Sequence, residues 1–266
     1  VPVFRRGAPV LELVGGYVLP GHVARASMAL RGIAAWSHET PVLYRVIATL
    51  RDPSGAVREV VSQRVGFRSV VVRDNQLLVN GQPVQIVVVN RHEWDDVRGR
   101  AVTLEGMRRD LELMKRHHVN AVRCSHYPND ERFYDLCDEL GLYVIDEANL
   151  ETHARWSSLC HDARYQTAML ERGARMVLRD RNHACVIAWS LGNESGYGAA
   201  HDAMAAWIRR VDPTRPLHYE GAIGKDLHAQ APVSDLVCPM YSEIHEIVAW
   251  SRARRDRRRP LILCEY

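Results

Sequence analysis

Apolar residues follow two different patterns along this chain, and the pattern changes near Val84. Before that point the apolar runs are short and broken by turn sequences, which is typical of antiparallel strands. Asp52-Pro-Ser-Gly55 predicts one turn, and Asn80-Gly81 predicts a hairpin turn between residues 77–79 and 84–89. Further strands are predicted at 43–50, 57–65 and 70–72. We interpret residues 40–85 as the closing part of an all-β sandwich and residues 1–39 as a weaker β pattern.

From Val84 onward the chain repeats the order strand, loop, helix. Thr103 is placed to cap a helix with Met107, Leu111 and Met114 on one face, and Gly141 is placed to end the next helix. Further helices are predicted at 167–179, 199–210 and 243–254, and strands at 86–89, 119–123, 142–145, 186–190, 217–219, 236–238 and 261–264. This alternation predicts a parallel sheet covered by helices.

Two arrangements of such a sheet are possible, an open doubly wound sheet and a closed (β/α)₈ barrel. No glycine-rich phosphate turn follows the first strand, as a nucleotide-binding open sheet would need. Polar residues follow nearly every strand instead: Asn90-Arg-His-Glu93, Ser125-His126, Asp146-Glu147, Glu151, His153, Asn193-Glu194, Glu220, Tyr241 and Glu265. A barrel gathers the carboxyl ends of all its strands into one site, so the barrel is favoured.

The expected domain division is a partial, immunoglobulin-like β-sandwich over residues 1–68 and a TIM barrel over residues 69–266. Seven barrel strands are predicted, whereas a complete barrel has eight. We therefore expect the barrel to be incomplete at its C-terminal end within this chain.

Composition excludes several classes of protein. Apolar residues make up 47% of the chain and charged residues 25%, which is an ordinary globular balance. No apolar run approaches the roughly 18 residues of a membrane span, and no signal peptide is visible. Six arginines lie between Arg252 and Arg259, but no aromatic residues are interleaved and the net charge is only +3, so we expect a solvated helix end and no nucleic-acid partner. Six scattered cysteines are expected to be reduced core thiols, which favours the cytoplasm.

Two strand-end glutamates are the strongest candidates for chemistry. Glu194 follows the strand ending at Ser190 within a glycine-containing loop, and Glu265 follows the strand 261–264. Taken singly, the first could be a helix N-terminal acid and the second a strand-end residue without a task. Together, on the fourth and seventh strands, they face one another across a barrel mouth. Glycoside hydrolysis needs such a pair of carboxyls, one as acid/base and one as nucleophile.

The motifs around these residues resemble, in order and spacing, those of the β-galactosidases of glycoside hydrolase family two. The resemblance covers residues 36–266 and rests on Asn90–Glu93, Arg123–Asn129, Asp146–Asn149, Glu151–His153, Arg179–His183, Trp189–Ser195, Cys238–Tyr241 and Arg259–Tyr266. It implies a retaining glycosidase that removes terminal β-galactose, for example from lactose, through a galactosyl-enzyme intermediate. A related β-glucuronidase or β-mannosidase would share the barrel and both glutamates.

The resemblance also implies roles for individual residues. Glu194 matches the acid/base and Glu265 the nucleophile. Glu151 and His153, with Glu194, match ligands of Mg²⁺; read without the resemblance, they are a loop acid and a surface histidine, or a weak transition-metal site. The Na⁺ site of the complete protein is expected to need residues outside this chain. Family members suggest a homo-oligomer.

The implied substrate-binding residues are His92, His126, Asn193, Tyr241 and Arg123. Asn193 matches a residue that hydrogen-bonds the sugar 2-hydroxyl, and the histidines match sugar contacts. Read without the resemblance, the histidines are ordinary strand-end residues, and Arg123 is equally well explained by a structural ion pair.

One departure from the family pattern is Val87-Val88, where the family usually has Arg-Gly. This departure leaves open an inactive, sugar-binding chain. A third alternative is a metal-dependent hydrolase that works through Glu151 and His153 without Glu265.

Overall fold

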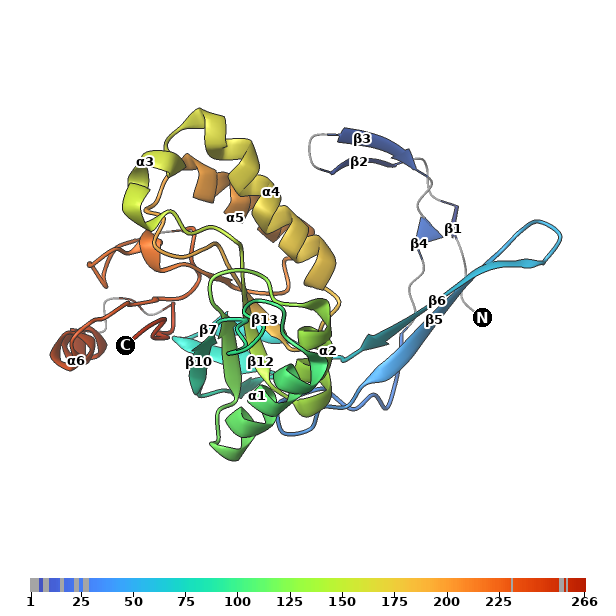
Figure 1. Ribbon diagram of the computed structural model, residues 1–266, viewed down its shortest axis with the longest axis horizontal. Helices are drawn as coiled ribbons and strands as arrows, with labels where there is room; N and C mark the ends of the chain where they lie inside the picture. Colours follow the sequence, from blue (N-terminus) through green and yellow to red (C-terminus); the bar gives the residue numbers. More distant parts are fainter. Residues whose placement is uncertain are drawn as a thin grey trace. The chain divides into compact units, whose positions relative to one another are not determined.

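The computed structural model describes residues 29–230, 232–253, 256 and 258–266, together with the backbone of residues 5–6, 10–14, 17–21 and 24–25. The chain divides into two compact units, residues 1–34 and 35–266 (Figure 1). The predicted domain boundary between residues 68 and 69 stays a prediction.

The first unit contains short antiparallel pairs. Strand β1 (Arg5–Arg6) pairs with β4 (Ala24–Arg25), and β2 (Val10–Val14) pairs with β3 (Tyr17–Gly21). These pairs agree with the β pattern predicted for residues 1–39; the other residues up to and including Met28 lie outside the described part of the chain.

The second unit begins with a long hairpin of β5 (Tyr44–Arg51) and β6 (Val57–Val65). Its turn forms as predicted, because Asp52 Oδ1 accepts hydrogen bonds from the backbone N–H groups of Ser54 and Ala56 at 2.9 and 3.0 Å. Most side chains of both strands are exposed, including the aliphatic ones. The hairpin is therefore a solvent-facing ribbon in the described structure.

A three-stranded antiparallel sheet follows, made of β7 (Val70–Arg73), β8 (Gln76–Val79) and β9 (Gln82–Pro83). The predicted turn is confirmed, since Asn80 and Gly81 have φ values of +53° and +77°. The predicted return strand at 84–89 is wrong. β9 ends at Pro83, the Val84 N–H makes one more hydrogen bond to the Leu77 carbonyl at 3.0 Å, and the next strand begins only at Val88.

The parallel sheet contains β10 (Val88–Arg91), β11 (Ala121–Cys124), β12 (Tyr143–Glu147), β13 (Val186–Ser190) and β14 (Leu217–His218), paired in chain order. The helices between them are α1 (Leu104–Arg116), α2 (Glu131–Leu140), α3 (Ser157–Cys160), α4 (Ala163–Asp180) and α5 (Ala199–Val211). Short 3₁₀ turns cover His153–Arg155 and Glu220–Ala222, and α6 covers Ile244–Ala253. Helix α1 packs beside α2, and α4 beside α5 (Figure 1).

The predicted sixth and seventh strands are reduced to isolated bridges. Val237 pairs with Leu261 and Met240 with Glu265, both in parallel, without continuous ladders. The carbonyl of Cys264 nevertheless accepts a hydrogen bond from the Asn90 side chain at 2.9 Å, which brings the seventh segment back beside the first strand. Such a return is impossible in an open sheet of seven strands, so the sheet curls as a barrel does.

Helix ends follow the predicted local signals. The Thr103 hydroxyl accepts the N–H of Gly106 at 3.0 Å and caps α1. Gly141 ends α2 with a φ of +73°, and a Cβ at this position would lie 2.4 Å from the backbone oxygen of His38. Gly141 is therefore required both by its backbone conformation and by close packing.

Two expectations about composition have clear outcomes. All six cysteines are free and buried, and no helix within the described residues is long and apolar enough to cross a membrane. The prediction that the arginine run is solvated is wrong for Arg259. This residue is buried, pairs with Asp256 at 2.6 Å and donates to the Ala229 carbonyl.

Candidate active site

Glu194 lies in a loop whose backbone is unusual. The fully buried Trp189 anchors β13, and the chain then passes through Gly192 (φ +135°), Glu194 (φ +41°) and Gly196 (φ +63°). A non-glycine residue in the left-handed region is uncommon and costs free energy, so the surrounding structure must hold it there. The loop thereby presents the Glu194 carboxylate with a side-chain exposure of 15%.

Glu265 receives hydrogen bonds on both carboxylate oxygens. Arg123 Nη1 donates to Oε1 at 2.9 Å, and the Tyr241 hydroxyl donates to Oε2 at 2.5 Å. Tyr241 is itself held by its backbone N–H, which donates to the Glu265 carbonyl at 3.1 Å. These donors fix the direction of the carboxylate and stabilise its negative charge.

Arg123 joins three strand ends. Besides Glu265, its Nε donates to Glu147 Oε2 at 2.7 Å and its Nη2 to Asn193 Oδ1 at 2.8 Å. Burial alone would raise the pKa of Glu147, but the charge of Arg123 acts together with the contacts from His126 and Ser190 and holds this pKa below its ordinary value. The sequence left open whether Arg123 serves the site or a structural ion pair; in the structure it makes both contacts.

The two histidines of the predicted set lie against each other. Their rings are 5.3 Å apart in an edge-to-face arrangement. His126 Nδ1 lies 2.8 Å from Glu147 Oε1, and its Nε2 lies 3.7 Å from Glu265 Oε1. Burial lowers the pKa of His126, but the hydrogen bond to Glu147 and the charges of Glu147 and Glu151 together raise it; burial and His126 lower the pKa of His92.

The two candidate catalytic carboxylates share one environment. The pKa of Tyr241 is raised to about 12, first by its hydrogen bond to Glu265 and then by burial, the Glu265 charge and the Glu194 charge. Arg123 also connects the two positions, because it binds both Glu265 and Asn193, the residue before Glu194. The structure thus brings the fourth- and seventh-strand glutamates to one end of the barrel.

A possible metal site adjoins Glu194. Glu151, His153 and Glu194, named here the carboxylate–histidine cluster, each offer a ligand atom within 4.8 Å of the others. His153 Nδ1 lies 2.5 Å from Glu194 Oε2, and Glu151 Oε1 accepts from Asn193 Nδ2 at 3.2 Å. Two carboxylates and one imidazole form a donor set that can hold a divalent cation.

Three residues beside the site were recognisable in the sequence at most as polar strand ends without a role. Glu147 is fully buried, and Ser190 Oγ donates to it at 2.6 Å. Glu220, 5% exposed, accepts the backbone N–H of Glu194 at 2.6 Å, and burial raises the pKa of Glu220 to about 7. The available signal was a carboxylate directly after the third and the fifth strand.

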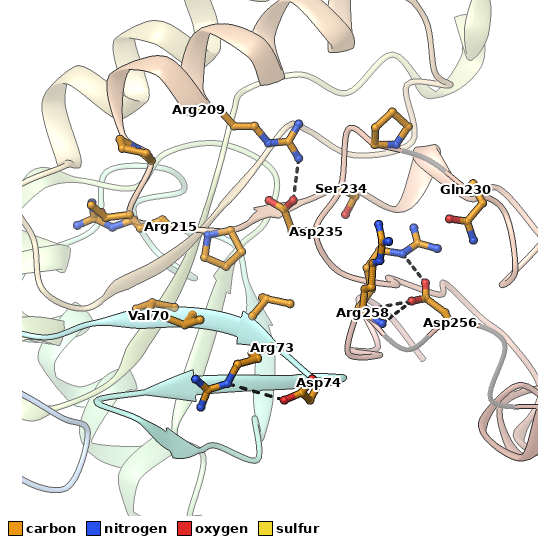
Figure 2. Close-up of a pocket in the computed structure, with 17 residues that line it drawn as sticks. Val70, Arg73, Asp74, Arg209, Arg215, Gln230, Ser234, Asp235, Asp256 and Arg258 are labelled. Atoms are coloured by element: carbon orange, nitrogen blue, oxygen red, sulfur yellow. Dashed lines mark hydrogen bonds and ion pairs between the residues drawn. The ribbon is translucent and has the colours of Figure 1, made fainter.

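Of two cavities relevant here, only the smaller touches the candidate residues. It has a volume of about 290 Å³ and is lined by residues 88–90, Tyr241 and residues 264–266. A cavity of about 970 Å³ lies between β7, the loop after α5 and the residues Asp256, Arg258 and Arg259 (Figure 2). Its arginines face aspartates, with Arg209 2.8 Å from Asp235, and it includes residues just before β14. It thus lies at the amino ends of the strands, away from the site.

Family models match nearly the whole chain. The model of the glycosyl hydrolases family 2 TIM barrel domain matches residues 70–266, and the glycosyl hydrolases family 2 model matches residues 15–68. The chain belongs to glycosyl hydrolases family 2. This confirms the predicted fold class, a family 2 TIM barrel preceded by a sandwich domain.

Individual relatives agree with this family. The chain is 51% identical over 243 residues to a beta-galactosidase of Aeromonas hydrophila, covering 87% of this chain and 23% of the relative. It is 47% identical over 242 residues to a beta-galactosidase of Lactococcus lactis, covering 87% and 24%. The fold matches the Ruminococcus gnavus beta-glucuronidase structure with a TM-score of 0.75 at 22% identity, covering 92% of this chain and 45% of that one. The chain thus spans about a quarter of the length of these curated relatives.

Proposed function

We propose that the protein containing this chain hydrolyses terminal β-galactosides with retention of anomeric configuration. The observation that carries the proposal is the convergence of Glu194 and Glu265 at one end of the barrel, where Arg123 binds both Glu265 and Asn193, the residue before Glu194. Two carboxyls that flank one bond are the machinery of glycoside hydrolysis.

In the proposed reaction, the Glu265 carboxylate attacks the anomeric carbon while Glu194 donates a proton to the departing glycosidic oxygen. The C–O bond to the leaving group breaks as the bond to Glu265 forms. Glu194, now a carboxylate, then takes a proton from water, and the resulting hydroxide displaces Glu265. The assignment follows the contacts, because Arg123 and Tyr241 both donate to Glu265 and fix the direction of its carboxylate.

The remaining polar residues support binding. Asn193 Oδ1 accepts from Arg123, which fixes the amide orientation and leaves its NH₂ group directed to Glu151 and the site. We assign it to the sugar 2-hydroxyl, where a hydrogen bond strengthens in the transition state. His92 and His126, stacked edge to face beside Glu265, are assigned to sugar hydroxyls.

The proposal includes Mg²⁺ at the carboxylate–histidine cluster. The donor set fits a divalent cation, since two of its three ligands are the carboxylates that Mg²⁺ prefers. When bound, the ion would offset negative charge beside Glu194 and restrict that side chain. His153, whose Nδ1 contacts Glu194, would then hold the ion from the exposed side of the loop.

Galactose is proposed over glucuronic acid because of the relatives. The curated relatives at 47–51% identity are beta-galactosidases, whereas the beta-glucuronidase structures match at 21–25% identity, where only the fold is comparable. The proposal also includes a cytoplasmic location, which the six free cysteines favour, and assembly into homo-oligomers, which the family resemblance suggests.

The test uses the full-length protein with a panel of 4-nitrophenyl β-D-glycosides. The galactoside is expected to be the best substrate, and ¹H NMR of the first product formed should show the β-anomer. Glu194→Gln should lower kcat/KM by roughly 10²–10⁴-fold, and Glu265→Gln should abolish turnover. Glu59→Gln, at an exposed position of β6, is the matched control and should behave as wild type.

Four outcomes would contradict all or part of the proposal. Turnover retained in Glu265→Gln would favour the metal-dependent hydrolase, and an α-anomer as first product would indicate inversion. Binding of galactose without turnover by the wild-type protein would favour the inactive sugar-binding alternative. Preference for the glucuronide or mannoside would overturn the sugar but not the roles of the two glutamates.

A further inference from the structure

Glu220 lies under the loop that carries Glu194 and has no role in the reaction described above. It opens the 3₁₀ turn Glu220–Ala222 directly after β14, and its side chain is buried. Its Oε1 accepts the backbone N–H of Glu194 at 2.6 Å. The residue is thus a side chain from the fifth strand that binds the main chain of the fourth-strand loop.

This contact acts at a backbone position that needs support. Glu194 has a φ of +41°, a conformation that L side chains rarely adopt. Its N–H lies beyond the regular ladder of β13, which ends at Ser190, and Glu220 supplies its acceptor. Without that acceptor, the loop would lose the contact that opposes relaxation of the Glu194 backbone, and relaxation would turn the Glu194 side chain.

Packing alone does not explain a carboxylate here. Glu220 Oε2 is buried and has no hydrogen-bond partner among the described residues. A buried polar atom without a partner costs stability, and a glutamate that served only to fill space would be replaced at less cost by an apolar side chain. What the carboxylate offers that an apolar side chain cannot is the oxygen acceptor for the Glu194 N–H.

We infer that Glu220 is a positioning residue: through its hydrogen bond to the Glu194 backbone it holds the acid/base carboxylate in the direction needed to protonate the leaving oxygen. The inference rests on the proposed function of Glu194. What matters is that an oxygen acceptor reaches the Glu194 N–H; the charge of Glu220 is not required.

Three variants of the full-length protein separate reach from charge. Glu220→Gln keeps an oxygen at the same distance but removes the charge. Glu220→Asp keeps the charge but is shorter by one methylene. Glu220→Met keeps the length but has no oxygen acceptor. If the requirement is an oxygen acceptor that reaches the Glu194 N–H, the Glu220→Gln variant should have wild-type activity. The Glu220→Asp and Glu220→Met variants should both be less active.

Two substrates make the assay specific for proton donation. The leaving group of 2,4-dinitrophenyl β-galactoside departs without a proton, whereas lactose needs one. Asp and Met are expected to lower kcat/KM for lactose by about 10- to 100-fold, the usual effect of a misplacement near 1 Å. For the dinitrophenyl substrate, kcat/KM should change by less than about 3-fold, because binding and the Glu265 attack do not depend on Glu220. Damage to the whole site would instead lower kcat/KM equally for both substrates.

Crystal structures of the variants give a readout that does not depend on turnover. The φ of Glu194 should stay positive in Glu220→Gln and leave the left-handed region in Glu220→Asp. If Glu220→Met does not fold, the Gln and Asp pair alone decides the question. An impaired Gln variant beside a normal Asp variant, or equal losses on both substrates, would overturn the inference. Failure of the proposed function would show in the wild type, which would then cleave neither galactoside.

Discussion

Replacing Arg123 by methionine should destabilise the protein strongly, because it leaves a buried carboxylate without its charged partner. Arg123 is 1% exposed and Glu147 is fully buried, and their side chains are 2.7 Å apart. Breaking such a pair by removing one partner costs about 3–5 kcal/mol, since the remaining charge stays out of water. Ser190 and His126 still contact Glu147 in the variant, which places the expected loss near about 3 kcal/mol, the lower end of that range.

The assay is urea unfolding of the full-length protein, followed by a probe of the barrel. The double variant Arg123→Met/Glu147→Gln is the informative partner, because the amide removes the stranded charge while keeping the shape. It should recover about 1–2 kcal/mol relative to Arg123→Met alone, a coupling of the size seen between contacting residues. If the losses of unfolding free energy caused by the two substitutions simply add in the double variant, Arg123 and Glu147 are not coupled.

The pH dependence of the same variants provides a second check. In the native protein the pKa of Glu147 is lowered from 4.5, so the pair contributes stability above that pH and loses it as the pH falls through the lowered value. Without Arg123, burial would raise the pKa of Glu147, and the variant would be penalised most at neutral pH. The difference between wild type and Arg123→Met should therefore shrink below about pH 5. A loss under about 1 kcal/mol, or a difference constant with pH, would refute this account of the pair.

Three further predictions concern other parts of the barrel. Gly141→Ala and Gly81→Ala both place a side chain at positive φ, which costs about 1 kcal/mol, but only at Gly141 would the new Cβ meet a backbone oxygen at 2.4 Å. In urea unfolding, Gly141→Ala should therefore lower the free energy of unfolding by about 1–3 kcal/mol more than Gly81→Ala does. Equal losses in the two variants would contradict the close approach of His38. Burial raises the pKa of Asp146, so its ionisation penalises the native state as pH rises. Asp146→Asn, which still accepts from Tyr134, should therefore gain stability relative to wild type as the pH rises above about 4, whereas parallel pH curves would count against it. A chelator should lower galactosidase activity and Mg²⁺ restore it, and His153→Ala should raise the half-saturating Mg²⁺ concentration about 10-fold or more; an unchanged value would exclude His153 as a ligand.

Local signals predicted the start of α1, the end of α2 and most strand positions of this chain, whereas α4 begins at Ala163, before its predicted start at residue 167. Thr103 and Gly141 were identifiable because a cap depends only on neighbouring residues. The predicted strand 186–190 matches β13 in both bounds, since its apolar run is buried on both faces. The segments around Val237 and Leu261 failed as strands because pairing depends on partners distant in sequence, and here they form only single bridges.

The candidate site shows the same division between local and distant information. The residues assigned by family resemblance lie together, but their interactions could not be read from the sequence. Whether Arg123 bridges Glu147, Glu265 and Asn193 depends on side-chain distances across three strands. Glu220 was recognisable only as a strand-end carboxylate, because its contact is with a backbone N–H, which leaves no signature in residue type.

The ribbon of β5 and β6 has a consequence for handling the protein. Six aliphatic side chains on it are between 50% and 62% exposed: Val46, Ile47, Leu50, Val57, Val60 and Val61. Neighbouring positions such as Val46 and Ile47 point to opposite faces, so neither face of the ribbon is polar. Within the described residues the ribbon also pairs with no other strand. A polypeptide restricted to these 266 residues is therefore expected to be poorly soluble and to self-associate through this ribbon when concentrated. Ile47→Lys and Val60→Thr are the substitutions to try first when such a polypeptide is to be produced.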